Sequence, residues 1–220
     1  MAKWKTLRET VLMSHRPWFE VIRQEVETDR GVIVPDFYQV RFGAFVVCVP
    51  FTVTGEVLTL RTYKHGLGRV STTFPAGYID PGEDPAEAMA RELMEETGYR
   101  AGRLVELGRF IDNGNQVGST GTYFAAFDCV PERAPDSGDL ETMEVVPLTP
   151  AELDSRLAGG DMPILHHAAA WMMAPRRIGE VSPPGPGPRS SRPARAGRGR
   201  CRRPRHARRV ARASGAPRNR

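Results

Sequence analysis

The sequence predicts an α/β or α+β sandwich in which strands outnumber helices. Most apolar segments are short and strand-like, and the continuous apolar run at residues 43–49 is typical of a central strand. The clearest helix covers residues 84–97, between strand segments, and two short helices are expected at 150–158 and 164–173. Strands that flank a helix and are followed by late helices favour helices packed on the faces of a sheet.

The other expected strands share apolar runs or alternation bounded by turn residues. Asp29-Arg30-Gly31 is a hairpin signal between the expected strands 20–26 and 32–40. These expected strands are 20–26, 32–40, 56–63, 104–111, 122–130 and 143–148.

The formal charge of +5 hides two parts of opposite sign. Residues 176–220 hold 15 arginines and one acid, Glu180, which leaves 16 basic and 25 acidic side chains in the first 175 residues. The three cysteines are too few and too widely spaced for a disulfide framework. The chain has no apolar run of membrane-spanning length and no signal-peptide pattern at the start, so we expect a cytoplasmic protein without membrane contact.

The basic segment 176–220 is rich in Arg, Pro, Gly and Ala without an apolar period, so we expect it to be disordered. Two interpretations stay open. The segment is an arm for nucleic acid or another anionic surface, or it is an extension without a role, of the kind that a shifted reading frame in a GC-rich gene produces.

The helix expected at 84–97 carries signals at both ends. Asp84 is a good N-cap, Pro85 suits the first turn, and Gly98 follows the last turn. Helical spacing groups Glu92, Glu95 and Glu96 on one face. We expect the opposite face to be buried; its residues are Ala86, Ala90, Leu93, Met94 and Thr97.

Three carboxylates on one helix face repel one another unless a positive charge lies on them. Hard oxygen ligands on a rigid element suit Mg²⁺ or Mn²⁺, which also bind phosphates. The alternative is a solvated acidic face without a ligand. We also expect Glu83 to pair with Arg91 and so hold the preceding loop onto the helix.

The segment 77–98 resembles the Nudix box. Gly77 is followed after five residues by Glu83 and after seven more by Arg91-Glu92-Leu93-Met94-Glu95-Glu96-Thr97-Gly98, so that seven fixed identities match. The resemblance implies a Nudix-type α/β/α sandwich that hydrolyses a nucleoside diphosphate linked to another moiety. It also implies that Glu92 and Glu96 are the principal metal ligands, with Glu95 and the Ala76 carbonyl as further ligands.

Sequence around the box is similar to the ADP-ribose pyrophosphatase branch of that family. The similar segments are Leu60-Arg61-Thr62-Tyr63-Lys64-His65-Gly66, Phe74-Pro75-Ala76-Gly77, Arg16-Pro17-Trp18 and Asp36-Phe37-Tyr38. This similarity implies an N-terminal strand extension at residues 1–40 that builds a homodimer, a Nudix domain at 41–175 and the tail at 176–220.

The same similarity suggests residues that bind a nucleotide-sugar substrate. Trp18, Phe37 and Tyr38 are candidates for stacking on the base, and Arg23 for the base or ribose; each is also compatible with core, interface or surface packing. Lys64 stands where related enzymes often carry a phosphate-binding arginine, and Arg61 is the neighbour expected to compensate.

A catalytic base is expected in the loop before residue 143, which resembles a late, mobile loop of this branch. We favour Glu141 over Glu144, because Glu144 already lies in a strand segment; an ordinary acidic loop is the alternative. His166 and His167 are expected to be non-catalytic. The segment 112–119 is a polar loop without the proline common in ADP-ribose enzymes, and it is a candidate contact for the terminal sugar.

The sequence therefore predicts Mg²⁺-dependent hydrolysis of ADP-ribose or a related nucleotide sugar to a nucleoside monophosphate and a sugar phosphate. Two alternatives stay open. One is a Nudix hydrolase of a nucleoside triphosphate or dinucleotide polyphosphate. The other is a nucleotide-sugar- or RNA-binding protein that uses the basic tail.

Overall fold

The computed structural model describes residues 3–178, and the basic segment predicted from residue 176 lies almost wholly outside that range. No helix within the described range is long and apolar enough to span a membrane. The strands are β1 (Lys5–His15), β2 (Phe19–Glu27), β3 (Ile33–Phe42), β4 (Phe45–Thr52), β5 (Val57–Lys64), β6 (Arg69–Thr73), β7 (Ala76–Tyr78), β8 (Tyr99–Arg100), β9 (Arg103–Asn113), β10 (Val117–Pro131) and β11 (Met143–Leu148). The α-helices are α1 (Pro85–Thr97), α2 (Pro150–Ala158) and α3 (Leu165–Ile178).

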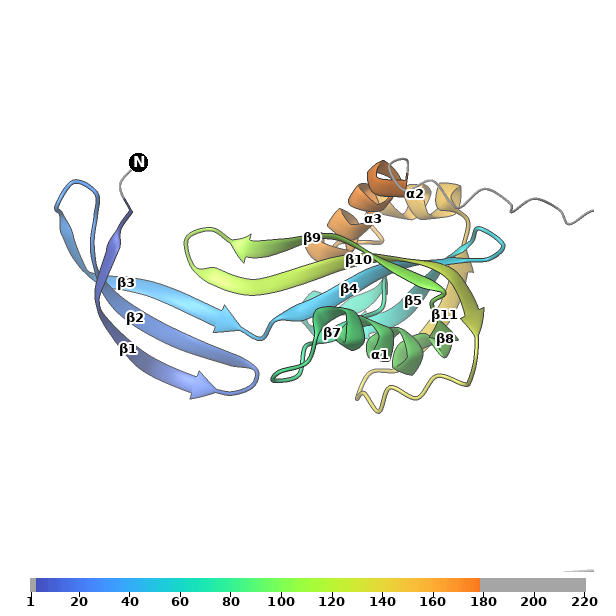
Figure 1. Cartoon of the computed structure of the whole chain (residues 1–220), viewed down its shortest axis with the longest axis horizontal. Helices are drawn as coiled ribbons and strands as arrows, with labels where there is room; N and C mark the ends of the chain where they lie inside the picture. Colours follow the sequence, from blue (N-terminus) through green and yellow to red (C-terminus); the bar gives the residue numbers. More distant parts are fainter. Residues whose placement is uncertain (1–2, 179–220) are drawn as a thin grey trace, which may run out of the picture. The chain divides into compact units, whose positions relative to one another are not determined.

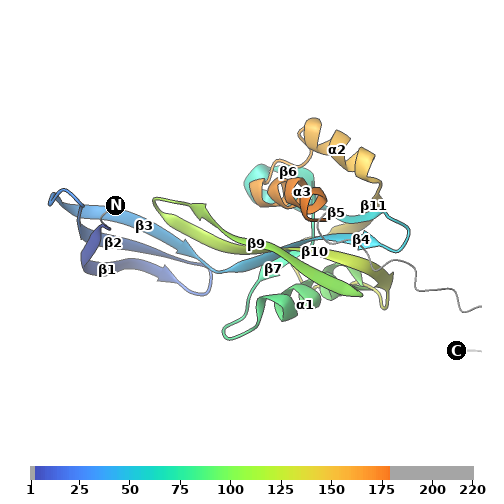
Figure 2. The same ribbon diagram turned by 45° about the horizontal axis from the view of Figure 1, so that its top comes forward.

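A central sheet between helices confirms the expected sandwich. Strand β10 pairs in parallel with β4 and antiparallel with β9, and β7 adds to the other edge of β4. Helix α1 packs on one face of this sheet and α3 on the other (Figures 1 and 2). The apolar run of β4 serves both faces, because successive side chains of a strand point to opposite sides.

The core is accordingly divided between the two faces of β4. Val46 and Cys48 belong to one buried cluster with Met89 and Leu93 of α1. Val47 and Val49 belong to a second cluster with Trp171 of α3. Burial on both faces explains why this strand is continuously apolar rather than alternating.

The first three strands form an antiparallel extension, and β3 joins the central sheet through a short parallel pairing with β10. Strand β1 was not expected from the sequence. None of its residues is buried, so it carries no alternation of buried and exposed positions to reveal it. The short strands β6, β7 and β8 were likewise not expected.

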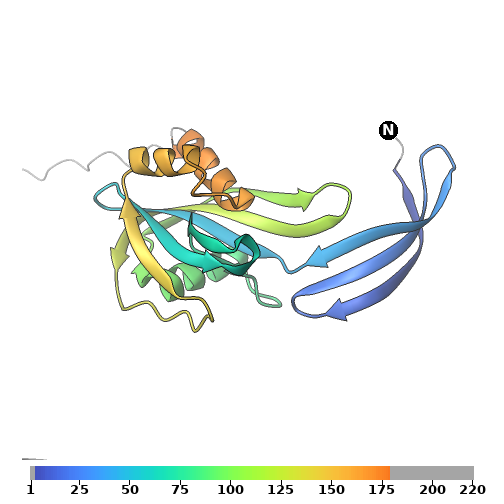
Figure 3. The ribbon, with the colours of Figure 1, turned by 180° about the vertical axis from the view of Figure 1, so that it is seen from behind.

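A smaller sheet, β6-β5-β11, lies beside the central one and brings a loop to the functional helix. Strand β11 pairs antiparallel with β5, and the segment between β10 and β11 runs along α1 (Figure 3). Within that segment Asp136 N donates a hydrogen bond of 2.8 Å to Glu95 O of α1. The loop that contains Glu141 is therefore attached to α1 before the chain enters β11.

The ends of α1 are those expected from the sequence. The Asp84 carboxylate accepts a hydrogen bond from Ala86 N at 2.8 Å, and Gly98 ends the helix in the left-handed conformation with φ 74°. A side chain at Gly98 would also place its Cβ only 2.0 Å from Arg133 O, so glycine is needed there for space as well.

The buried face of α1 was predicted correctly at Leu93 and Thr97 but wrongly at the two alanines. Ala86 and Ala90 are exposed, whereas Ala88, Met89 and Glu96 are buried together with Leu93. Alanine side chains carry too little apolar area to decide which face packs inward. The longer Met89 and Leu93 decide which face packs inward. Their burial turns Glu92 and Glu96 toward the sheet rather than away from it.

Side chains of α3 form hydrogen bonds with the segment between β6 and β7 and with α2. His167 Nδ1 accepts a hydrogen bond of 3.2 Å from Phe74 N, and Trp171 Nε1 donates one of 2.7 Å to Asp154 Oδ1. Because Nδ1 is the acceptor, the His167 proton lies on Nε2. Burial holds the pKa of His167 well below its usual value, and the neighbouring His166 and Lys64 lower it further.

We predict that His167 makes the metal-free protein less stable as the pH falls below 6.5. Below this pH the histidine is protonated in the unfolded chain but stays neutral in the native protein. The free energy of unfolding therefore drops by up to about 1.4 kcal/mol per pH unit. Above pH 6.5 this contribution is constant. Urea unfolding in EDTA between pH 5 and 8 measures it in the wild type and in His167→Gln.

The slope in the variant should be smaller than in the wild type by the share of His167. The slope that both proteins keep combines His166, whose pKa burial also lowers, with Glu96, whose raised pKa acts in the opposite direction. His65→Gln, at an exposed position, is the matched control and should keep the wild-type slope. Equal slopes in His167→Gln and the wild type contradict this prediction.

Candidate functional site

One guanidinium gathers the acidic side chains of the box. Arg91 Nε and Nη2 donate to the two Glu83 oxygens at 2.9 and 3.0 Å, as expected from the sequence. Arg91 Nη1 also donates to Glu92 Oε1 at 2.7 Å and to Glu95 Oε2 at 3.2 Å. A further bond of 3.1 Å to Tyr78 O ties the same side chain to the last residue of β7. Arg91 thus fixes the loop, the helix and the strand relative to one another.

These contacts shift the titration of both partners. Hydrogen bonds from Arg91 lower the pKa of Glu83, and those to Glu83 and Glu92 raise the pKa of Arg91. Glu92 behaves differently: its partial burial raises its pKa, although Arg91 opposes that shift. Glu92 is therefore a desolvated carboxylate whose charge is only partly compensated.

Glu96 is the most deeply buried carboxylate of the cluster, with 6% of its surface exposed. Its Oε2 accepts a hydrogen bond of 2.9 Å from Ala76 N. Burial nevertheless raises the pKa of Glu96 to about 8, and the charges of Glu92 and Asp139 act in the same direction. A carboxylate in this position gains stability from any cation that approaches it.

Gly77 is required by the same arrangement. A Cβ atom at this position would lie 2.1 Å from Glu92 Cδ, far inside contact distance. Only glycine lets the Glu92 carboxylate lie against the backbone that follows Ala76. The first fixed residue of the box thus has a steric reason.

The oxygen atoms of these carboxylates suit a hard divalent cation, although the carboxylates do not point toward one common position. Among residues 3–178, no three acidic, imidazole or thiol groups stand close enough together to hold a metal ion. Glu92 and Glu95 are turned to Arg91 and Glu96 to Ala76 N. Three carboxylates and the Ala76 carbonyl would supply oxygen ligands from adjacent rigid elements, which is the chemistry that Mg²⁺ and Mn²⁺ prefer.

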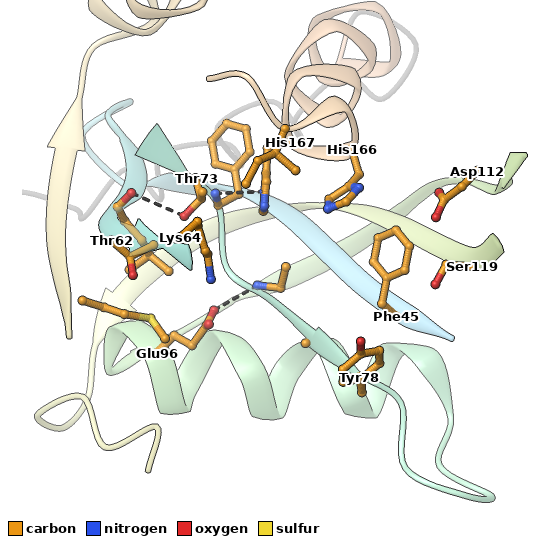
Figure 4. A pocket seen from close by; sticks show the side chains of 16 residues that line it. Phe45, Thr62, Lys64, Thr73, Tyr78, Glu96, Asp112, Ser119, His166 and His167 are labelled. Carbon is orange, nitrogen blue, oxygen red and sulfur yellow. Dashed lines mark hydrogen bonds between the residues drawn. The ribbon is translucent and has the colours of Figure 1, made fainter. Parts of the chain in front are cut away.

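Two cavities meet at these carboxylates. The inner cavity, of about 340 Å³, extends from Glu96 toward the first turn of α3 (Figure 4). The outer cavity, of about 540 Å³, lies over Arg91, Glu92 and the loop with Glu141. Residues that line both are Lys64, Ala76, Gly77, Tyr78, Glu96 and Met143. A two-part ligand could place one part in each space.

Several predicted site residues are brought together here. Lys64 Nζ and the Glu141 carboxylate form an ion pair at the junction of the cavities. Trp18 lines the outer cavity, edge-on to Tyr78 with ring centroids 5.8 Å apart. Glu144 lies in β11 as expected and is exposed.

Other predicted residues lie elsewhere. Arg61 lines neither cavity. Thr62 and Lys64 line the inner one, and alternation along β5 turns Arg61 to the other side of the strand. There its positive charge helps to lower the pKa of Asp161. Arg23 and Tyr38 are cross-strand neighbours on β2 and β3, both exposed and outside the two cavities.

Sequence reasoning missed some cavity residues. His166 and His167 were set aside, yet both line the inner cavity at the start of α3, where His166 packs against Phe45 at 4.9 Å between ring centroids. Thr62 lies there as well. The available signals were the position of the histidine pair at a helix start and the two-residue spacing between Thr62 and Lys64.

Comparisons with known proteins agree with this geometry. The NUDIX domain profile matches residues 41–168. The chain is 32% identical over 107 residues to the ADP-sugar pyrophosphatase of Mus musculus. This alignment covers 46% of this chain and 49% of that protein. It is 32% identical over 71 residues to the ADP-ribose pyrophosphatase of Bacillus subtilis (strain 168), covering 32% of this chain and 38% of that protein.

These two alignments thus span no more than about half of either relative. A crystal structure of an ADP compounds hydrolase superposes with a TM-score of 0.70 at 24% identity, covering 82% of this chain and 96% of that one, which shows the same fold. The domain match, the fold and the seven residues of the box agree, and the chain belongs to the Nudix family.

Proposed function

We propose that the protein is a Mg²⁺-dependent pyrophosphohydrolase of ADP-ribose or a related nucleotide sugar, releasing a nucleoside monophosphate and a sugar phosphate. The observation that carries the proposal is the buried carboxylate cluster at the junction of two cavities, with Lys64 beside it. The similarity to an ADP-sugar and an ADP-ribose pyrophosphatase supports the substrate class.

Glu92, Glu95, Glu96 and the Ala76 carbonyl would hold the divalent cation. When bound, it neutralises the pyrophosphate and activates the attacking water. Arg91 and Glu83 position the carboxylates, and Lys64 contacts a phosphate as a point charge without the two-pronged geometry of arginine. Mn²⁺ suits the same oxygen ligands.

The two cavities fit the two halves of such a substrate. Trp18 offers the outer cavity an aromatic surface on which a base stacks. The inner cavity combines apolar walls with polar groups, as Figure 4 shows, and suits the sugar. The bridging P–O bond would then lie over Glu96, between Lys64 and Glu92.

We expect Glu92→Gln to lower the hydrolysis of ADP-ribose at least about 100-fold while the fold is kept, because even groups that only support metal ligands contribute 10- to 100-fold. Coupled measurement of AMP and ribose 5-phosphate gives the rate. The control is Glu87→Gln, an exposed acid in the first turn of α1. Near-native turnover by Glu92→Gln would refute the metal-binding role.

A substrate panel separates the alternatives within the same chemistry. ADP-ribose and ADP-sugars yield AMP and a sugar phosphate, whereas nucleoside triphosphates and dinucleotide polyphosphates yield other products. Faster turnover of triphosphates than of any ADP-sugar would reject the proposed substrate class.

Glu141 is the proposed general base. Its ion pair with Lys64 already places it at the junction of the cavities, on a loop attached to α1. We predict that Glu141→Gln lowers kcat by about 10²- to 10⁴-fold with a smaller effect on KM. Glu144→Gln, three residues later and exposed, is the matched control; a larger loss in Glu144→Gln would reverse the assignment.

We also propose that the N-terminal extension pairs with a second copy of the chain. Seven large apolar side chains are exposed on β1 and β3, which is unusual for a surface that stays in water. They are Leu7, Val11, Leu12, Met13, Ile33, Tyr38 and Phe42. The resemblance to the ADP-ribose pyrophosphatase branch supports a homodimer through this sheet.

Light scattering tests the dimer. The wild type should have twice the 24.4 kDa chain mass, and the double variant Leu12→Glu/Met13→Glu should have the mass of one chain, because charges do not tolerate a buried apolar interface. Val53→Glu changes an exposed apolar residue outside β1–β3 and should stay dimeric. A monomeric wild type would reject the proposal.

A further inference from the structure

Two neighbouring hydroxyl groups lack partners among residues 3–178 at one end of the inner cavity, one on Thr62, which lines the cavity, and one on Ser71, which does not line it. Thr62 and Ser71 lie directly opposite each other on β5 and β6, and each is 99% buried. Among the described residues, neither Thr62 Oγ1 nor Ser71 Oγ finds a hydrogen-bond partner. A buried, unsatisfied polar group costs about 1–3 kcal/mol, so a ligand that supplied the missing hydrogen bond would be stabilised here.

Other polar groups face the same space. Thr62 lines the cavity, and Thr73 lies diagonally across from it, with its hydroxyl making only a long bond of 3.4 Å to Leu60 O. His167 Nε2 makes no hydrogen bond to the described residues, since its bond to Phe74 uses Nδ1. In Figure 4, Thr62, Thr73, Lys64 and His167 surround the end of the cavity that lies away from Asp112 and Ser119.

The chemistry of this end is polar but mainly uncharged. The Thr62 and Thr73 hydroxyls and the neutral His167 imidazole offer both donors and acceptors, and the Lys64 charge is paired with Glu141. Leu60, Phe74 and Ile164 supply apolar walls beside them. A sugar has this composition, with hydroxyls that need donors and acceptors and C–H faces that pack on apolar side chains, whereas a second phosphate would lack a free cation.

We propose that this end of the inner cavity binds hydroxyl groups of the sugar that leaves as sugar phosphate, and that Thr62 is its specificity-determining residue. The inference rests on the proposed function, since it needs a sugar linked to the pyrophosphate. Thr62 Oγ1 then exchanges a hydrogen bond with a sugar hydroxyl, and Thr73 and His167, which line the same cavity, complete the contacts.

The test compares Thr62→Val and Thr62→Ser with Thr59→Val. Valine keeps the shape of threonine and removes the hydroxyl, and serine keeps the hydroxyl. Thr59 is a matched control, because it is equally buried in the same strand but donates a hydrogen bond of 2.6 Å to Val146 O. The probes are ADP-ribose as substrate and ribose 5-phosphate and AMP as inhibitors.

We expect Thr62→Val to lower kcat/KM for ADP-ribose about tenfold and to weaken inhibition by ribose 5-phosphate similarly, without changing inhibition by AMP. Thr62→Ser should restore both. Thr62→Val should also unfold at a urea concentration no lower than the wild type, because it removes an unsatisfied group, whereas Thr59→Val should be less stable and kinetically normal.

Wild-type kinetics in Thr62→Val, or equal weakening of AMP and ribose 5-phosphate, would overturn the assignment of this subsite. Failure of the proposed function looks different: the wild type itself would not hydrolyse ADP-ribose, and both proposals would then be overturned.

Discussion

The site depends on the charge of one guanidinium. Glu83, Glu92 and Glu95 would repel one another on the loop and one face of α1 if Arg91 did not lie among them. Its planar, multiply donating group is suited to several carboxylates at once, which an ammonium group is not. Arg91 thus offsets part of the repulsion among these carboxylates and holds them close together, as the proposed metal site requires.

A second constraint is the segment between β6 and α1, which is fixed from several sides. His167 holds Phe74 N, Glu96 holds Ala76 N, and Glu92 lies against Gly77. The backbone that offers the Ala76 carbonyl is therefore anchored by α3 as well as by α1, the two helices on opposite faces of the central sheet. Core packing and site geometry are coupled through this segment, because displacement of either helix would move a residue of the proposed metal site.

Local signals predicted much of this arrangement. Asp84 and Gly98 define the ends of α1, the apolar run of β4 indicates a strand buried on both faces, and the spacing from Gly77 to Gly98 identifies the box. The predicted buried face of α1 was correct at Leu93 and Thr97 but wrong at the two alanines, because alanine buries little apolar area. Glu96 is buried as well, because it accepts a hydrogen bond from Ala76 N, twenty residues earlier in the chain. Alternation along the strand from Lys64 could have predicted that Arg61 points away from the cavity. Strand β1 could not be predicted in this way, because it has no buried residue. The contact of His167 could not be predicted either, because its partner Phe74 lies 93 residues away in the sequence.

The most direct test of this arrangement is a calorimetric titration of Mg²⁺ and of Mn²⁺ into the wild type and into a Glu92→Gln/Glu96→Gln double variant, each with and without AMP. We expect saturable uptake of a divalent cation by the wild type, strengthened by nucleotide, and none by the folded double variant. Absence of uptake by the wild type, or equal uptake by both proteins, would contradict the assignment of these carboxylates as the metal-binding centre.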